Sequence, residues 1–237
     1  MSGDTHSEAF VRRLFDEMAQ TYGLVNMISS LGFAYLWRRQ AVRALPRPAV
    51  AVADLMAGGG ECLGLLKAHF GPDVRVDLVD WSRGMCERAE AVVERGRYRE
   101  TRVWCTSALA VPVADHTYDA IVSTFGMKTL TDEETQAFAR ELRRILKPDG
   151  RFSILEFSKP RSRIVAPFFR FYVQHYVPFL GRLFLGNPDN YRMLWRYTDE
   201  FGDCSRVAEI LRREGFEVAF TRWFFGSATQ VIGRRIT

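Results

Sequence analysis

Apolar and polar positions follow one another along the middle of the chain in an order that predicts alternating strands and helices. Short apolar runs, typical of buried strands, are separated by longer segments with the periodicity of a helix that buries one face. The expected strands are 50–56, 74–80, 102–105, 119–124 and 151–157, and the expected helices are 61–69, 83–95 and 132–146. Such alternation requires crossover connections, so the pattern predicts a mostly parallel sheet with helices on its faces.

The two ends of the chain complete this picture. Residues 8–45 have apolar side chains spaced for one buried helical face. A last helix is expected over 203–214, followed by strands at 216–223 and 228–234. Two closing strands joined by a tight connection add an antiparallel hairpin to the sheet edge. We therefore expect an α/β, Rossmann-like fold with seven strands.

The stretch 160–195 breaks the strand–helix alternation, because aromatic and Arg residues are mixed throughout it. It is open whether this stretch is a lid over the active site, a surface that rests on a membrane or an ordinary packing layer. We expect a single domain, 1–237, divided into an N-terminal helical cap (1–48), a cofactor-binding core (49–159), a lid or substrate-binding insertion (160–198) and a closing helix and hairpin (199–237).

A glycine loop between the first core strand and its helix is the first candidate site. Gly58, Gly59 and Gly60 let the backbone approach a ligand closely, and the following helix directs unpaired N–H groups at it. Asp54, at the strand end, can accept hydrogen bonds from an ammonium group. Asp80 ends the next strand roughly 20 residues further on, the usual distance to an acidic residue that binds ribose hydroxyls.

Two features favour S-adenosylmethionine over a dinucleotide. The loop lacks a third glycine at position 63, which pyrophosphate binding needs, and the closing hairpin resembles the class I methyltransferase fold. Ligands of open α/β sheets bind outside the carboxyl ends of the strands, and Trp81 can lie flat against an adenine ring. The cofactor-binding residues predicted at these ends, including those that the family resemblance described next implies, are Asp54, Met56, Ala57, Gly58, Gly60, Asp80, Trp81, Ser107, Ala108 and Thr124.

Four segments spread over nearly the whole chain carry a resemblance to a known family. They are Tyr22–Asn26 with Ser30, Gly32 and Trp37; Phe125–Gly126 with Thr131–Asp132; residues 144–160 (RILKPDGRFSILEFSKP); and residues 187–194 (NPDNYRML). Together they resemble the ubiquinone and menaquinone biosynthesis C-methyltransferases.

The resemblance implies methyl transfer from S-adenosylmethionine to a ring carbon of a prenylated quinol. It implies cofactor contacts from Asp54, Gly58, Gly60 and Asp80, and it places Tyr22 over the cofactor. It also suggests substrate contacts from Asn26, Thr129 and Tyr191. The chain departs from the family pattern at Lys128–Thr129, where the family has an Arg–Asn pair, and at Ser107, where it has an acidic residue.

The chemistry of C-methylation indicates further candidates. In-line methyl transfer depends mostly on positioning, and an aromatic ring becomes electron-rich when it loses a phenolic proton. His175 and Lys128 are the candidate catalytic bases, with Tyr22 or Tyr191 as hydrogen-bond partners. Lys128 serves as a base only if burial lowers its pKa, and otherwise it stabilises a phenolate.

Composition narrows the remaining choices. The net charge of +5 is compatible with several partners. The four cysteines and four histidines form no metal or disulfide pattern, so we expect no metal and a cytoplasmic location, with membrane contact and a homodimer left open. The expected partner is a small lipophilic aromatic substrate and not nucleic acid. The alternatives are O- or N-methylation of a secondary metabolite or lipid, a non-methylating relative, and a non-catalytic scaffold subunit.

Overall fold

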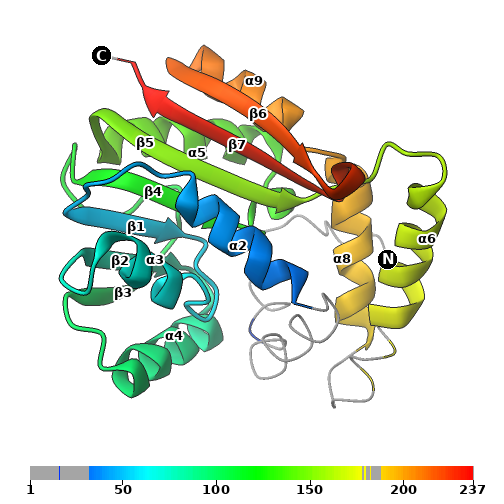
Figure 1. Ribbon diagram of the computed structural model, residues 1–237, viewed down its shortest axis with the longest axis horizontal. Helices are drawn as coiled ribbons and strands as arrows, with labels where there is room; N and C mark the ends of the chain where they lie inside the picture. Colours follow the sequence, from blue (N-terminus) through cyan, green and yellow to red (C-terminus); the bar gives the residue numbers. More distant parts are fainter. Residues whose placement is uncertain (1–15, 17–31, 178, 180–181, 183–187, 237) are drawn as a thin grey trace.

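A seven-stranded sheet forms the centre of the computed structural model, which describes residues 16, 32–177, 179, 182 and 188–236 (Figure 1). The strand order is β3-β2-β1-β4-β5-β7-β6. The first five strands pair in parallel, and β7 runs antiparallel to both β5 and β6. The strands are β1 (Ala51–Leu55), β2 (Arg75–Asp80), β3 (Thr101–Cys105), β4 (Tyr118–Thr124), β5 (Leu146–Phe157), β6 (Phe216–Trp223) and β7 (Ala228–Arg235). The predicted fold and its antiparallel edge are confirmed.

Helices cover both faces of this sheet, as crossover connections require. One face packs against α2 (Phe33–Arg43), α3 (Leu63–Phe70) and α4 (Arg83–Gly96) through one apolar cluster. The other packs against α5 (Asp132–Ile145) and α9 (Ser205–Arg213) through a second. All five residues of β1 are buried, because this strand lies in the middle of the sheet with helices on both sides.

Helix starts fix the segments that follow the strands. Thr131 accepts a hydrogen bond from the N–H of Glu134, and Glu134 accepts one from the N–H of Thr131, which forms a capping box at the start of α5. Ser82 caps α4 through the N–H of Met85. Asp16 adds to this cap by accepting from Ser82 Oγ at 2.6 Å. These caps hold the loops after β2 and β4 in place.

The stretch without strand–helix alternation is largely helical. It contains α6 (Val165–Phe171), a π-helical turn η2 (Tyr172–Tyr176) and α8 (Pro188–Phe201). Figure 1 shows α6 and α8 side by side, beyond the carboxyl ends of the parallel strands. No helix in the described ranges is long and apolar enough to cross a membrane. The expected division into cap, core, insertion and closing segments stays a prediction.

Phe152 on β5 is a suitable residue for testing the core. Its side chain is fully buried and meets Phe216 edge-on at 5.2 Å between ring centroids. Phe152→Ala leaves a cavity, so we expect a loss of about 3–5 kcal/mol in the free energy of unfolding, measured by urea denaturation. Phe168→Ala, at an exposed position on α6, serves as the control and should change stability by about 0.5 kcal/mol or less. Equal effects of the two substitutions would contradict the packing described here.

Candidate functional site

An open cleft lies where the carboxyl ends of β1, β2 and β4 meet. Its empty volume, counted out to solvent, is about 880 Å³. The residues around it come from the segments after each strand, from the start of α5 and from α2: Arg38, Met56, Ala57, Gly58, Glu61, Asp80, Trp81, Met85, Ser107, Ala108, Leu109, Thr124, Phe125, Gly126, Thr129, Leu130 and Glu134. The cleft is therefore at the sheet edge that the sequence predicts.

The backbone that borders this cleft is strained at two non-glycine residues. Met56 follows β1 with φ 58° and Phe125 follows β4 with φ 67°, both in the left-handed region. Gly58 and Gly60 are also left-handed, with φ 57° and 80°. A Cβ at Gly58 would lie 2.9 Å from the movable carboxylate end of Glu61, so it is the left-handed φ that favours glycine there. Side chains resist this conformation, and such strain is typical of ligand sites.

Asp80 joins the glycine loop to the second strand. Its carboxylate accepts hydrogen bonds from Gly58 N at 2.8 Å and from Ser82 N at 3.0 Å. Burial raises the pKa of Asp80 to about 6, although these two N–H groups act in the opposite direction. A carboxylate can accept about four hydrogen bonds, so Asp80 retains capacity for ribose hydroxyls.

Asp54 is the least satisfied buried group near the cleft. It is 1% exposed, and neither carboxylate oxygen has a hydrogen-bond partner among the described residues. Burial and the nearby Glu61 carboxylate raise the pKa of Asp54 well above its ordinary value, while the Arg38 guanidinium and the Cys62 thiol oppose the shift. A buried carboxylate without a partner is costly, so this site favours a ligand that brings a cation or hydrogen-bond donors.

Arg38 supplies the opposite charge from helix α2. Its side chain borders the cleft, is 8% exposed and lies over the ring of Phe125 at 4.9 Å from the centroid. The Nε atom of Arg38 has no hydrogen-bond partner in the described part of the chain, and Oε1 of Glu61 has none either, although it forms a long ion pair with Arg88 at 4.0 Å. A cation and two carboxylates therefore flank one end of the cleft, which suits an amino acid zwitterion.

Lys128 lies beside the cleft but is not among its lining residues. It belongs to a short turn η1 (Met127–Thr129) and forms a buried ion pair with Glu156, 2.9 Å between Nζ and Oε1. Its Nζ also donates to the carbonyl of Phe125, and its N–H donates to Glu156 at 3.1 Å. The ion pair holds the turn that places Thr129 in the cleft wall.

The other predicted residues divide into three groups. Two of them do not line the cleft, Asp54 on β1 and Gly60 in the glycine loop; those that line it together are Met56, Ala57, Gly58, Asp80, Trp81, Ser107, Ala108, Thr124 and Thr129. His175 is exposed on η2 and stacks on Phe171, 4.9 Å between centroids. Tyr22, Asn26 and the side chain of Tyr191 lie outside the described residues. The catalytic and binding roles assigned from the sequence stay predictions.

Several lining residues were missed from the sequence. Arg38, Glu61 and Glu134 are charged residues on helices or loops, where charge usually indicates a solvated face. For Glu61, its position directly after the three glycines could have indicated that it borders the ligand site. The role of Arg38 depends on how α2 crosses the sheet, which no local pattern predicts.

Asp54→Asn tests the unpaired charge. Because the pKa of Asp54 is raised on folding, the stability it contributes is present at low pH and lost as pH rises through the raised pKa. At neutral pH, without ligand, we expect Asp54→Asn to stabilise the protein by about 1–3 kcal/mol. The gain should shrink as pH falls toward about 4, the ordinary Asp value. Urea denaturation at several pH values measures it.

Asp119→Asn is the matched control. Partial burial raises the pKa of Asp119, but Lys147 at 2.6 Å and the N–H groups of Val50 and Ala51 outweigh this and lower it. The same substitution there should destabilise the protein at neutral pH, with the loss disappearing in acid. A destabilised Asp54→Asn variant at neutral pH would contradict the account of the site.

Solved structures confirm the fold. The chain is similar to a SAM-dependent methyltransferase from Aquifex aeolicus, with a TM-score of 0.55 at 19% identity over 79% of this chain and 82% of that one. It is similar to a possible histamine N-methyltransferase from Thermotoga maritima, with a TM-score of 0.62 at 18% identity over 94% and 98%. The [4+2]-cyclase SpnF also matches, with a TM-score of 0.59 at 14% identity over 84% and 80%. At these identities the likeness concerns the fold alone.

Sequence relatives give the family. The demethylmenaquinone methyltransferase of Thermotoga maritima is 35% identical over 98% of both chains. The ubiquinone/menaquinone biosynthesis C-methyltransferase UbiE of Desulfotalea psychrophila is 31% identical over 92% of this chain and 87% of its own. The model of the ubiE/COQ5 methyltransferase family matches residues 3–235. The chain therefore belongs to the ubiE/COQ5 methyltransferase family.

Proposed function

We propose that this methyltransferase binds S-adenosylmethionine in the cleft and methylates a ring carbon of a quinol-like or other lipophilic aromatic acceptor. The observation that carries the proposal is the pair of opposite, incompletely satisfied charges, Asp54 and Arg38, at the glycine loop. A zwitterionic amino acid group satisfies both, and among Rossmann-type cofactors S-adenosylmethionine has one.

The residues around the cleft fit the rest of this cofactor. Asp54 and Glu61 suit the ammonium group, Arg38 suits the carboxylate, and Asp80 suits the ribose. An adenine ring fits the side of the cleft that contains Trp81, Met85 and the segment 107–109. When bound, the cofactor supplies an electrophilic methyl group on a sulfonium sulfur. The protein contributes position and exclusion of water.

The acceptor end of the cleft is formed by the segments after β4. Phe125 and Leu130 provide apolar surface there, and Thr129 and Glu134 provide polar groups. Thr129 donates to the carbonyl of Gly126 at 2.8 Å, so its hydroxyl oxygen is free to accept a hydrogen bond. Glu134 is available to orient a phenolic hydroxyl. A flat apolar ring with a hydroxyl group suits this mixture.

The acceptor class is supported by the relatives. Demethylmenaquinone methyltransferases and UbiE proteins match this chain over nearly its whole length. The turn η1 borders the acceptor end and contains Lys128–Thr129 in place of the family's Arg–Asn pair. Because of this substitution, O- or N-methylation is the second candidate reaction. Identification of the methylated atom separates the two. The scaffold alternative predicts that S-adenosylmethionine does not bind.

Arg38→Ala tests the cofactor site by calorimetry with S-adenosylmethionine. Loss of a charged hydrogen-bond donor should weaken binding by about 1.5–3 kcal/mol, roughly tenfold to 150-fold. Arg38→Lys keeps the charge and should recover part of this loss. Arg39→Ala, at an exposed position of the same helix, should bind like the unmodified protein. Absence of binding by the unmodified protein would exclude the proposed function and favour the scaffold alternative.

The predicted catalytic role of Lys128 needs a test that separates chemistry from folding. Lys128→Met leaves the buried Glu156 carboxylate without its partner and should cost about 3–5 kcal/mol of stability. Because the ammonium group faces Glu156 and Phe125, we expect the double variant Lys128→Met/Glu156→Gln to recover both stability and kcat. A stable double variant with a low kcat and normal cofactor binding would instead show that Lys128 acts on the acceptor.

A further inference from the structure

Two segments far apart in the sequence expose large apolar side chains near the loop that leads into α6. The first is the outer side of α6 with the residue before it, and the second is the turn between β6 and β7, labelled η3 (Phe224–Gly226). Together the two segments carry five large apolar side chains that are each more than half exposed. We call this set the aromatic surface: Ile164, Phe168, Phe171, Phe224 and Phe225. A group of exposed large apolar side chains of this kind marks a site of interaction.

The turn between β6 and β7 contacts the loop that leads into α6. A Cβ added at Gly226 would lie 3.7 Å from the backbone nitrogen of Arg161 and 3.9 Å from the Cα of Pro160, just before α6. Arg161 in this loop and Arg222 on β6 also bind the same carboxylate, that of Asp203, at 3.0 and 3.2 Å. Figure 1 shows the turn at the upper end of α8, next to the loop that leads to α6.

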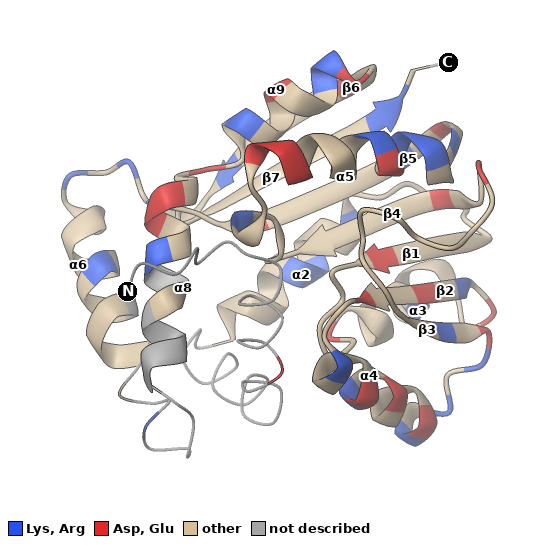
Figure 2. Ribbon diagram, turned by 180° about the vertical axis from the view of Figure 1, so that it is seen from behind, with Lys and Arg blue, Asp and Glu red and all other residues tan. Residues whose placement is uncertain are grey.

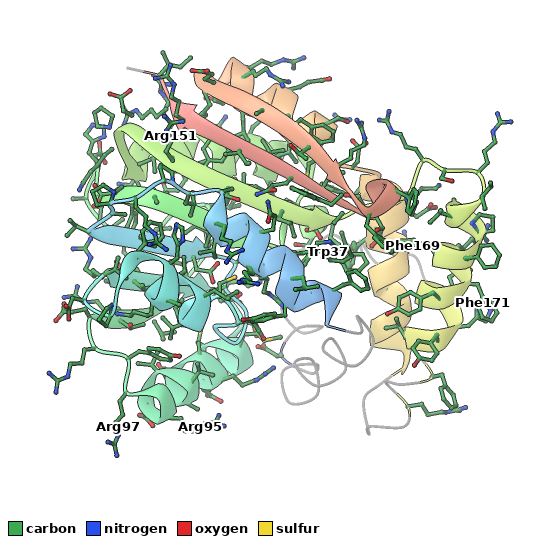
Figure 3. The ribbon with its side chains drawn as sticks, viewed as in Figure 1. Trp37, Arg95, Arg97, Arg151, Phe169 and Phe171 are labelled. Atoms are coloured by element: carbon green, nitrogen blue, oxygen red, sulfur yellow. The ribbon has the colours of Figure 1, made fainter. Side chains whose placement is uncertain are left out.

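The exposed rings are not needed for the packing of α6. Phe169 faces the domain and stacks on Phe157 at 5.8 Å between ring centroids, and its neighbours Phe168 and Phe171 are exposed. In Figure 3, Phe169 lies on the side of α6 toward Trp37, and Phe171 lies at the outer margin. One aromatic residue therefore fixes the helix, and the others face outward.

The hairpin turn keeps its rings exposed at the cost of backbone strain. Phe224 and Phe225 have φ 45° and 58°, and Gly226 follows with φ 88°. Tight hairpin turns with positive φ at both central residues favour Asn and Gly, and bulky residues resist this conformation. Two phenylalanines with positive φ at a solvent-exposed turn do not favour formation of the turn. Such backbone strain is typical of functional positions.

The charge around the aromatic surface is positive. No Asp or Glu occurs from residue 157 to residue 188, a stretch that holds Lys159, Arg161, Arg163, Arg170 and Arg182. Figure 2 shows Lys and Arg but no Asp or Glu on α6 and on the loop before it. Asp199 and Asp203 from neighbouring elements pair with Lys159 and Arg161. Among the described carboxylates none pairs with Arg163 or Arg170, which remain available to an anionic partner.

We propose that the aromatic surface binds an anionic lipid bilayer. Phenyl rings flanked by Arg, without acidic residues, are the composition that enters the boundary between headgroups and acyl chains. The helix α8 packs against both η2 and the turn η1 that contains Thr129, so the surface is connected to the acceptor end of the cleft. The proposed function explains why such docking is useful, since a lipophilic acceptor resides in the bilayer, but the docking itself does not depend on it.

The test is co-sedimentation with vesicles in the absence of S-adenosylmethionine. Vesicles of phosphatidylcholine with phosphatidylglycerol should bind the unmodified protein, and vesicles of phosphatidylcholine alone should bind it less. Added salt should weaken the binding. Phe168→Ser/Phe171→Ser and, separately, Phe225→Asn should each lower the partition coefficient by about tenfold. Asn tolerates positive φ, so Phe225→Asn should have a Tm no lower than that of the unmodified protein.

The matched control is Val50→Ser, which removes an exposed apolar side chain at the opposite end of the sheet and should not change vesicle binding. Failure of the unmodified protein to bind anionic vesicles, or equal binding by all variants, would overturn the proposal. So would a dimer in lipid-free solution that Phe168→Ser/Phe171→Ser dissociates, because the surface would then join two copies of the chain. Calorimetry with S-adenosylmethionine on the same variants shows separately whether the cofactor site is intact.

Discussion

The site depends on one costly arrangement, the buried carboxylate of Asp54 without a hydrogen-bond partner in the described structure. Its position at the end of a fully buried central strand removes water, and Glu61 adds a second negative charge. Arg38 offsets part of this cost from another helix. The free protein therefore contains buried charged groups that would be stabilised by a zwitterionic ligand. The free energy that these groups cost on folding would be recovered on binding. The left-handed backbone at Met56 and Phe125 belongs to the same arrangement, because it turns the chain sharply at the strand ends beside the cleft.

The sequence predicts the sheet, its antiparallel hairpin and the glycine loop because each has a local cause. Parallel strands such as β1 are continuous apolar runs, and the residues at their carboxyl ends must meet at one edge. Arg38 could not be found this way, since its role requires the crossing of α2 over the sheet. The direction of the Lys128 side chain was also beyond local reasoning. Its partner Glu156 lies on the next strand, 28 residues later, and the resemblance to the family drew attention to the turn rather than to the ion pair.

The role of the helical stretch after β5 could not be predicted from the pattern of apolar and polar residues. Its aromatic and Arg residues fit a lid, a membrane surface or a packing layer equally well, because periodicity cannot say which neighbours cover a helix. In the structure, residues within one helical turn have different environments: Phe169 packs inward on Phe157, and Phe171 is exposed. The same region adjoins the turn that carries Lys128 and Thr129. The departure from the family's Arg–Asn pair thus lies in the turn η1, which α8 contacts.

The central claim is methyl transfer to a ring carbon, and product analysis tests it most directly. S-adenosylmethionine with a ¹³C-labelled methyl group is incubated with the protein and a reduced, prenylated naphthoquinol or benzoquinol presented in anionic vesicles. The account predicts a product whose labelled methyl group is bonded to an aromatic carbon, seen by NMR. A label on oxygen would show that the Lys128–Thr129 turn accompanies a different reaction. No labelled product from either quinol, with the cofactor bound, would contradict the acceptor class itself.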